Sequence, residues 1–128
     1  MKASREYQPL CDRQQFRRVY EQGQRFHAPY FSAFILRTGG GQRRIGITVT
    51  RKIGKAVTRN RCKRRLREVV RNYFVSASKD SAMPSGYDLV INVKSGLAES
   101  DFKQLQESFA RVMARSHDSL LKLSGDAL

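Results

Sequence analysis

The sequence has 128 residues, with 25 lysines and arginines against 11 aspartates and glutamates, so its formal net charge is +14. This length and a hydrophobic fraction of 40% suit one domain with one modest core, and they argue against a chain that is disordered throughout. The charge favours an anionic partner. Nucleic acid is preferred over a membrane because no apolar run approaches the roughly 18 residues of a spanning helix.

Two features predict that the protein works in the cytoplasm. A secretory signal has an apolar stretch after its first charges, and the N-terminus of this sequence has none. The cysteines, Cys11 and Cys62, lie far apart and lack the spacing of a zinc site, which indicates reduced thiols and no bound metal. Residues 1–10 are polar and basic and are expected to form a loose arm.

The first helix is predicted to begin at Asp12, a good N-cap with Gln15 in the capping-box position, and to end at Gly23. A glycine there suits the left-handed conformation that often follows a helix. Cys11 and Phe16 are spaced as a hydrophobic staple. The apolar face has two interpretations, core anchors or a stacking platform for unpaired bases, and it consists of Phe16, Val19 and Tyr20.

Three strands are predicted from β-forming composition and alternation. They cover residues 30–37, residues 43–51 after a loop of three glycines, and residues 87–93, and a further short strand is possible near residues 23–27. In the second strand, isoleucine and valine alternate with small or hydroxylic residues, and the face of small residues leaves room for a ligand. That face carries Gly46, Thr48 and Thr50.

Residues 51–71 are dominated by arginine and lysine, with Glu68 as the single acidic residue. From Thr58, a suitable cap, apolar residues recur every three or four positions and predict an amphipathic helix. A solvated face is one interpretation of its charges. We prefer a nucleic-acid surface, because matching carboxylates are absent and the arginine fork suits bidentate phosphate binding. The charged face carries Arg61, Arg64, Glu68 and Arg71.

The remainder of the chain completes one domain over residues 1–128. Turn-forming residues predict a loop over residues 76–86, and a last helix begins near Ser100 and is followed after His117 by a frayed tail. The element order is α-β-β-α-β-α, which predicts an α+β fold with one sheet packed against helices. The ordered core is expected over about residues 7–116, between a flexible N-terminal arm and a flexible C-terminal tail.

No catalytic constellation is found in the sequence. The histidines, His27 and His117, have no acid or base partner at a recognisable spacing. The carboxylates do not cluster as ligands for a pair of metal ions, and no activated serine or cysteine is evident. We therefore predict neither catalytic residues nor a metal site in the protein, so that any associated chemistry is supplied by a partner.

The segment that starts the basic helix resembles the signature of the bacterial ribonuclease P protein subunit. The matching residues are Arg51-Lys52, Gly54, Ala56-Val57, Arg59-Asn60-Arg61, Lys63-Arg64 and Arg67-Glu68. The resemblance covers roughly residues 7–116. It implies a two-layer α/β sandwich in which one mixed sheet packs with helices. It also implies a left-handed β-α-β crossover carrying the basic RNR helix, against the usual right-handed rule.

The same resemblance implies a function. Such a subunit joins a large catalytic RNA, which with Mg²⁺ removes the 5′ leader of precursor tRNA. The expected partners are therefore the catalytic RNA and precursor tRNA, without an obligate protein partner, and Mg²⁺ is held mainly by the RNA subunit and substrate phosphates. The positions expected near the catalytic RNA are Arg59, Asn60, Arg61, Lys63, Arg64 and Arg67. Those expected at the single-stranded leader are Phe16, Tyr20, Phe34, Arg51 and Lys52.

Tyr20 stands where the family usually has phenylalanine. A tyrosine ring still stacks, but its hydroxyl needs water or a partner. Two other functions are considered, a small structural rRNA-binding protein of ribosomal type and an autonomous metal-dependent nuclease. An aromatic cleft for the leader favours the ribonuclease P subunit over the first, and the missing metal ligands argue against the second.

Overall fold

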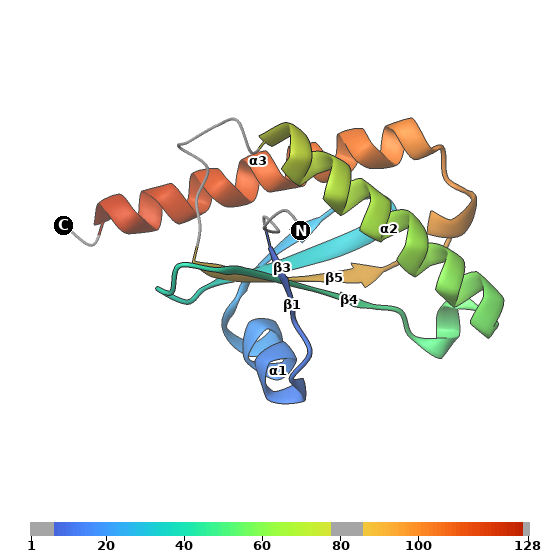
Figure 1. Ribbon diagram of the computed structural model, residues 1–128, viewed down its shortest axis with the longest axis horizontal. Helices are drawn as coiled ribbons and strands as arrows, with labels where there is room; N and C mark the ends of the chain where they lie inside the picture. The colour runs from blue at the N-terminus through green and yellow to red at the C-terminus, as the bar shows by residue number, and fades with distance from the viewer. Residues whose placement is uncertain (1–6, 78–85, 127–128) are drawn as a thin grey trace, which may run out of the picture.

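The computed structural model describes residues 7–77 and 86–126, and Figure 1 shows their arrangement. A five-stranded sheet lies at the centre, with its strands in the spatial order β1-β4-β5-β3-β2. The strands are β1 (Gln8–Pro9), β2 (Gln24–His27), β3 (Phe31–Arg37), β4 (Arg43–Thr48) and β5 (Tyr87–Val93). The helices are α1 (Arg13–Gln22), α2 (Ala56–Ala77) and α3 (Phe102–Asp126), with short 3-10 turns η1 (Arg51–Ile53) and η2 (Leu97–Glu99).

The sheet is mixed because its strands pair in both directions. β5 pairs antiparallel with β3 and parallel with β4, and β3 also pairs antiparallel with β2. The parallel neighbours β4 and β5 are joined through α2. In Figure 1 both strands run from left to right, with β4 nearer the viewer and α2 above them, so this crossover is left-handed. The mixed sheet and the unusual hand expected from the family resemblance are confirmed.

α2 and α3 cover one face of the sheet, and the main core lies between them and the strands (Figure 1). The spacing of the apolar residues on α2 places them along one stripe that points into this core, which leaves the opposite face of the helix to solvent. The residues of that stripe are Cys62, Leu66, Val69, Val70 and Phe74, all buried. Burial of the stripe therefore fixes which side of α2 carries its charges outward.

α1 lies on the other face of the sheet and adds a partial third layer (Figure 1). Its Val19 is fully buried against the sheet beside Val90 of β5. The partly buried side chains that pack around this smaller cluster are Phe16, Tyr20, Phe34 and Leu36. The sheet thus has a large apolar core on one side and a small, partly aromatic one on the other.

The end of α1 differs from the prediction. Gly23 has φ −80°, so it does not take the left-handed conformation. A Cβ at this position would lie 2.6 Å from the carbonyl oxygen of Val19 and 2.8 Å from that of Ile35, so the close approach of β3 is what requires glycine. At the other end the predicted cap is confirmed, because the Asp12 carboxylate accepts a hydrogen bond of 2.9 Å from the N–H of Gln14.

The segment before α1 also differs from the predicted loose arm. β1 pairs in parallel with β4, and Leu10, which follows it, is buried. Leu10 packs in the cluster that holds Phe16, whereas Cys11 is exposed. The predicted staple is therefore wrong in its first residue. Residues 1–6 of the predicted arm lie outside the described residues.

The predicted ends of two helices are wrong. α2 begins at Ala56, so Thr58 lies within the first turn and is not its cap. α3 continues to Asp126, whereas the prediction ended this helix near His117. Leu120 is buried, which extends the apolar stripe of α3 beyond the predicted end.

Every predicted strand is present, including the short one near residues 23–27, but the second ends at Thr48 and not at residue 51, which begins η1. The predicted loop over residues 76–86 falls largely on residues 78–85, which lie outside the described residues. Within the described ranges, none of the helices combines the length and apolar character needed to cross a membrane.

Candidate nucleic-acid interface

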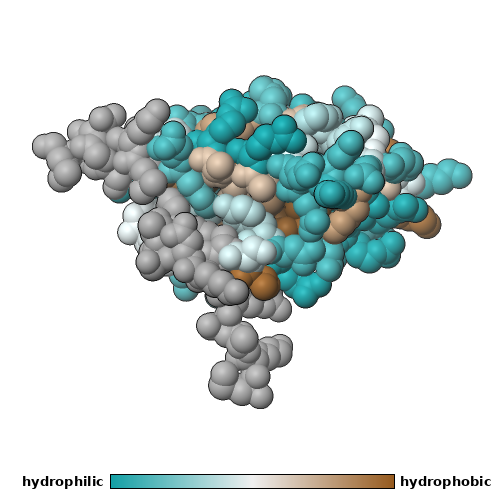
Figure 2. Space-filling model, turned by 90° about the horizontal axis from the view of Figure 1, so that it is seen from above, coloured by the Kyte–Doolittle hydropathy of each residue, from teal (hydrophilic) through white to brown (hydrophobic). Residues whose placement is uncertain are grey.

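α2 presents a row of cationic side chains that have few carboxylate partners. The exposed predicted RNA contacts are Asn60, Arg61, Arg64 and Arg67, and the half-buried ones are Arg59 and Lys63. Within residues 7–77 and 86–126, the one ion pair on this helix joins Arg71 to Glu68 and lowers the pKa of the Glu68 carboxyl. Figure 2, which looks onto α2 and α3, shows hydrophilic side chains over most of this face. The other cations can therefore meet phosphates without giving up an ion pair.

Two arginines of α2 have structural contacts. Arg59 donates from Nη1 to the carbonyl oxygen of Gly54 at 2.9 Å and so holds the turn before the helix. Gly54 has φ 149°, a conformation that L side chains rarely adopt, which explains the glycine of the signature. Arg65 donates to the carbonyl oxygen of Ser100 and lies over the ring of Phe102. Arg65 therefore ties α2 to the start of α3 and is not part of the outward face.

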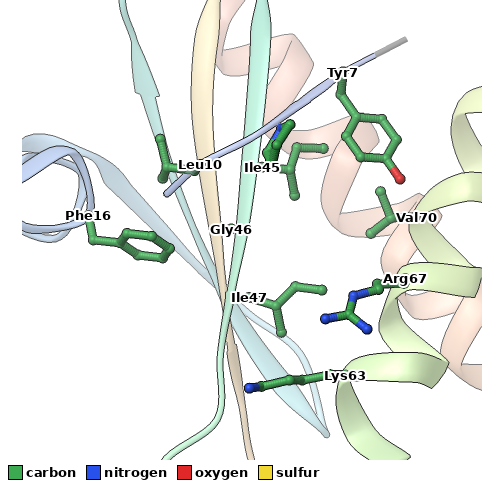
Figure 3. A pocket seen from close by; sticks show the side chains of 10 residues that line it. Tyr7, Leu10, Phe16, Ile45, Gly46, Ile47, Lys63, Arg67 and Val70 are labelled. Atoms are coloured by element: carbon green, nitrogen blue, oxygen red, sulfur yellow. The ribbon is translucent and has the colours of Figure 1, made fainter. Parts of the chain in front are cut away.

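A hollow of about 310 Å³ lies between α1 and α2, along β4. Figure 3 shows Phe16 reaching toward it from α1, while Lys63 and Arg67 reach toward it from α2 on the other side of the strand. These residues were predicted for two separate RNA contacts, and the structure brings them to one hollow. The full lining is Tyr7, Pro9, Leu10, Phe16, Ile45, Gly46, Ile47, Lys63, Arg67 and Val70.

The hollow exists because β1 is short. The last contact of this segment with β4 is the hydrogen bond of 2.9 Å from the N–H of Leu10 to the carbonyl oxygen of Ile45. Beyond that point, no strand in the described part of the chain pairs with the outer edge of β4. The open edge is flanked by an aromatic ring on one side and two cations on the other, a combination suited to a base and its phosphates.

Phe16, Tyr20 and Phe34 form what we call the aromatic surface, on the α1 side of the sheet. The rings of Tyr20 and Phe34 meet edge to face with centroids 5.0 Å apart, and the Arg25 guanidinium lies 5.4 Å from the centroid of Phe34. All three aromatic side chains are only partly buried, so part of each ring stays accessible. The surface combines partly accessible aromatic rings with a cation, and both features favour binding of unpaired bases.

The Tyr20 hydroxyl has the partners that its position demands. It donates to Oδ1 of Asn92 at 2.6 Å and lies 2.9 Å from Oγ1 of Thr48, from which it can accept. Tyrosine in place of the usual phenylalanine therefore fixes α1 to the sheet at β4 and β5. These two contacts hold the Tyr20 ring in one orientation, and a ring that does not rotate freely favours stacking of a base.

The structure separates the other two predicted leader residues from the aromatic surface. Arg51 and Lys52 are exposed in η1, just after β4, and no described contact joins them to the three rings. The space directly over Gly46 is filled by Phe16, because a Cβ there would lie 2.4 Å from Cζ of that ring, whereas the hollow that Gly46 also lines provides room beside it. Glycine at this position lets the Phe16 ring lie directly on the strand.

An ion pair between a partly exposed arginine and a buried aspartate stabilises the sheet beneath α1. Arg44 donates from Nε to Oδ1 of Asp88 at 2.7 Å and from Nη2 to Oδ2 at 2.9 Å. The Asp88 side chain is 1% exposed and that of Arg44 is 28% exposed. The pair raises the pKa of Arg44, chiefly through this hydrogen bond. Such a bidentate pair holds β4 and β5 in register at the position where the strands face α1.

The two histidines lie in different parts of the fold and have different hydrogen-bond partners. His117 is buried and lies 3.1 Å from the Tyr87 hydroxyl, and its burial lowers its pKa to about 4. It is therefore a neutral hydrogen-bond partner in the core at physiological pH. His27 lies in β2 with its Nδ1 3.5 Å from Oγ of Ser32.

The possible metal ligands of the described residues are scattered over the fold. No group of three or more histidine, cysteine, aspartate or glutamate side chains gathers in residues 7–77 and 86–126. The donors that do gather are guanidinium and ammonium groups, which bind anions. That the protein itself holds no metal stays a prediction.

The Ribonuclease P family model matches residues 5–117, nearly the whole described chain. The chain belongs to the ribonuclease P protein family. It is 37% identical over 102 residues to the "Ribonuclease P protein component" of Natranaerobius thermophilus, with 80% of this chain and 84% of that protein covered. It is 36% identical over 107 residues to the protein of the same name from Finegoldia magna, with 84% and 88% covered.

The fold is also similar to a solved structure of the same family. The RNase P protein from Thermotoga maritima superposes with a TM-score of 0.69 at 29% identity, covering 84% of this chain and 96% of that chain. The likeness therefore extends over most of this chain and nearly the whole of that one.

Several residues of the interface were not predicted from the sequence. Thr48 and Asn92 hold Tyr20, and Leu10 and Tyr7 line the hollow. Strand alternation provided a usable signal for Thr48, since it predicted a hydroxylic face on β4. The others depend on pairing between segments far apart in the chain, which periodicity does not reveal.

Proposed function

We propose that this chain is the protein subunit of a ribonuclease P, which binds the catalytic RNA and the 5′ leader of precursor tRNA during removal of that leader. The observation that carries the proposal is the pair of surfaces on the two sides of β4. One is a cationic helix face with few carboxylate partners, and the other is a partly exposed aromatic surface. Because the chain belongs to the ribonuclease P family, RNA is the proposed ligand of both surfaces.

The α2 face is proposed to bind the catalytic RNA. Arginine and lysine contacts to phosphates position a folded RNA without reading its bases, and guanidinium groups can make them bidentate. Arg64 and Arg67 suit this role directly because they are exposed. Arg59 is partly engaged with Gly54, so its contribution also includes holding the turn. The proposed contacts are Arg59, Asn60, Arg61, Lys63, Arg64 and Arg67.

The aromatic surface is proposed to bind the single-stranded leader. Stacking on aromatic rings tolerates any base and contributes about 1–3 kcal/mol per base, which suits leaders of variable sequence. Arg51 and Lys52 extend the proposed contacts beyond β4 by binding leader phosphates. The proposed leader set is Phe16, Tyr20, Phe34, Arg51 and Lys52.

The hydrolysis itself is assigned to the RNA partner. Mg²⁺, when bound, is proposed to be held mainly by the RNA subunit and substrate phosphates and to stabilise negative charge during phosphodiester cleavage. The residues of this chain bind and orient RNA, and none is proposed to be catalytic. The working location is proposed to be the cytoplasm.

The test is cleavage of precursor tRNA in the presence of Mg²⁺, by the purified protein with and without its cognate catalytic RNA. We expect cleavage only when the RNA is present, with the protein increasing the affinity for precursor over mature tRNA. Cleavage by the protein alone would overturn the assignment of chemistry to the RNA. A protein that binds the catalytic RNA no better than ribosomal RNA and does not change cleavage would instead support the ribosomal-type alternative.

A further inference from the structure

A second cationic hollow lies at the opposite edge of the sheet, between β2 and α3. It has a volume of about 200 Å³ and is lined by the β2–β3 turn and by one face of α3. The lining residues are His27, Ala28, Pro29, Ser108, Arg111, Val112 and Arg115. None of them belongs to the catalytic-RNA contacts or to the leader contacts proposed above.

The α3 residues of this hollow lie on one side of the helix. Ser108, Arg111 and Arg115 follow at spacings of three and four, which places them on one face. Arg111 and Arg115 are both exposed, and no described carboxylate lies within ion-pair distance of either. Two like charges on successive turns repel each other, so an anion bound between them would relieve that repulsion.

The rest of the hollow supports the same ligand. Lys94 donates from Nζ to the carbonyl oxygen of Ala28 at 2.9 Å, which holds a further positive charge at the turn. Arg115 lies 5.7 Å from the ring centroid of Phe26, an interaction that restrains its guanidinium. Ser108 adds a hydroxyl group. The hollow is smaller than the roughly 300–1,000 Å³ typical of small-molecule sites, so it suits one backbone group better than a cofactor.

The position of the hollow connects it to the aromatic surface. Arg25 and His27 lie two residues apart on β2 and therefore point to the same face of the sheet. Arg25 lies over Phe34 of the neighbouring strand, and His27 lines the hollow. Because adjacent strands are about 5 Å apart, a chain that leaves Phe34 toward β2 reaches the edge of the sheet after one strand.

We propose that the hollow between β2 and α3 binds a backbone phosphate of the leader beyond the part held on the aromatic surface. In this arrangement the leader crosses Phe34, passes over the edge of β2 and meets Arg111 and Arg115 on the other side. The proposal rests on the proposed function and adds a distal contact to it. It predicts that long leaders gain affinity from α3 and that short leaders do not.

The test uses the protein reconstituted with its catalytic RNA, and it compares Arg111→Ala with Lys103→Ala. Both residues are exposed cations of α3, and only Arg111 lines the hollow, so the two variants remove the same charge at different places. Affinity is measured for precursor tRNAs whose leaders differ only in length, at several salt concentrations. Thermal melts of both variants serve as the folding control.

We expect Arg111→Ala to weaken binding of long-leader substrates a few-fold while short-leader substrates bind as before. The slope of log affinity against log salt should fall by about 0.7, because the variant neutralises one phosphate fewer on a single strand. Lys103→Ala should change neither value. Equal affinities and salt slopes for the two variants at every leader length would show that the hollow does not bind the leader.

A weaker affinity for the catalytic RNA alone, independent of the leader, would assign the phosphate to that RNA and overturn the leader path. The unmodified protein separates these results from failure of the proposed function. If it neither binds the catalytic RNA nor promotes cleavage, the function itself is wrong before any variant is compared.

Discussion

The two sides of β4 differ in how their polar groups are satisfied. On the α2 side, Arg61, Arg64 and Arg67 are exposed and have no described carboxylate partner. On the α1 side, Asp88 holds Arg44 in a bidentate pair, and the Tyr20 hydroxyl has two partners. The difference distinguishes two kinds of residue. The exposed cations are proposed to bind RNA and should contribute little to folding, whereas the paired residues on the α1 side hold the strands and α1 together.

The largest effect should come from salt acting on the α2 side. If six to ten phosphates are contacted, affinity for the catalytic RNA should fall by roughly 10³–10⁵ between 50 and 200 mM salt, because binding releases counterions from the RNA. A filter-binding titration over this range measures the slope. A flat titration would contradict a cationic clamp on this side of β4.

The next largest effect should be on folding, from Arg44→Met on the α1 side. This change leaves the Asp88 carboxylate, 1% exposed, without its partner, so the unfolding free energy should fall by about 3–5 kcal/mol. Urea denaturation measures this decrease. The matched variant Arg64→Met removes an exposed arginine and should have the denaturation midpoint of the unmodified protein within experimental error. Equal decreases in the unfolding free energy of the two variants would contradict the difference between the two sides of β4.

A smaller decrease in stability should follow from Gly46→Ala. The added Cβ would lie 2.4 Å from Cζ of Phe16, so the ring must move, and overpacking of this kind costs about 1–3 kcal/mol. Gly41→Ala is the control, because nothing lies within 4 Å of its Cβ position. Thermal melts of the two variants should differ clearly. Identical melts would mean that Phe16 does not rest on β4.

The smallest effect should come from Tyr20→Phe. The ring is kept, so leader binding should be unchanged, while removal of the hydrogen bonds to Asn92 and Thr48 should lower the unfolding free energy by about 1 kcal/mol. Denaturation and leader affinity are measured on the same preparation. A large decrease in leader affinity with unchanged stability would show that the hydroxyl binds RNA and does not hold α1.

The sequence predicted the elements that depend on local patterns. The period of α2, the alternation of β4 and the Asp12 cap are properties of neighbouring residues, and all three are present in the structure. The left-handed crossover was expected only from the family resemblance, because local sequence patterns carry no information on handedness. The roles of the site residues also came from that resemblance. The predicted left-handed conformation of Gly23 failed because the close approach of β3, a tertiary contact, decides that position.

The candidate site was predicted less completely for the same reason. The aromatic residues Phe16, Tyr20 and Phe34 come together as expected, but their partners Asn92 and Thr48 come from strands distant in sequence. The hollow that joins Phe16 to Lys63 and Arg67 depends on where β1 stops pairing. A boundary of this kind results from competition between pairings, so composition does not reveal it.

The most direct test compares Arg64→Ala and Phe16→Ala in protein reconstituted with the catalytic RNA. We expect Arg64→Ala to weaken binding of the catalytic RNA and to lower its salt slope by about 1, with an unchanged thermal melt. Phe16→Ala should instead remove about 1–3 kcal/mol of the leader-dependent part of substrate binding at every salt concentration. An unchanged RNA affinity and salt slope in Arg64→Ala would contradict RNA binding by the α2 face, and an unchanged leader-dependent part in Phe16→Ala would contradict leader binding by the aromatic surface.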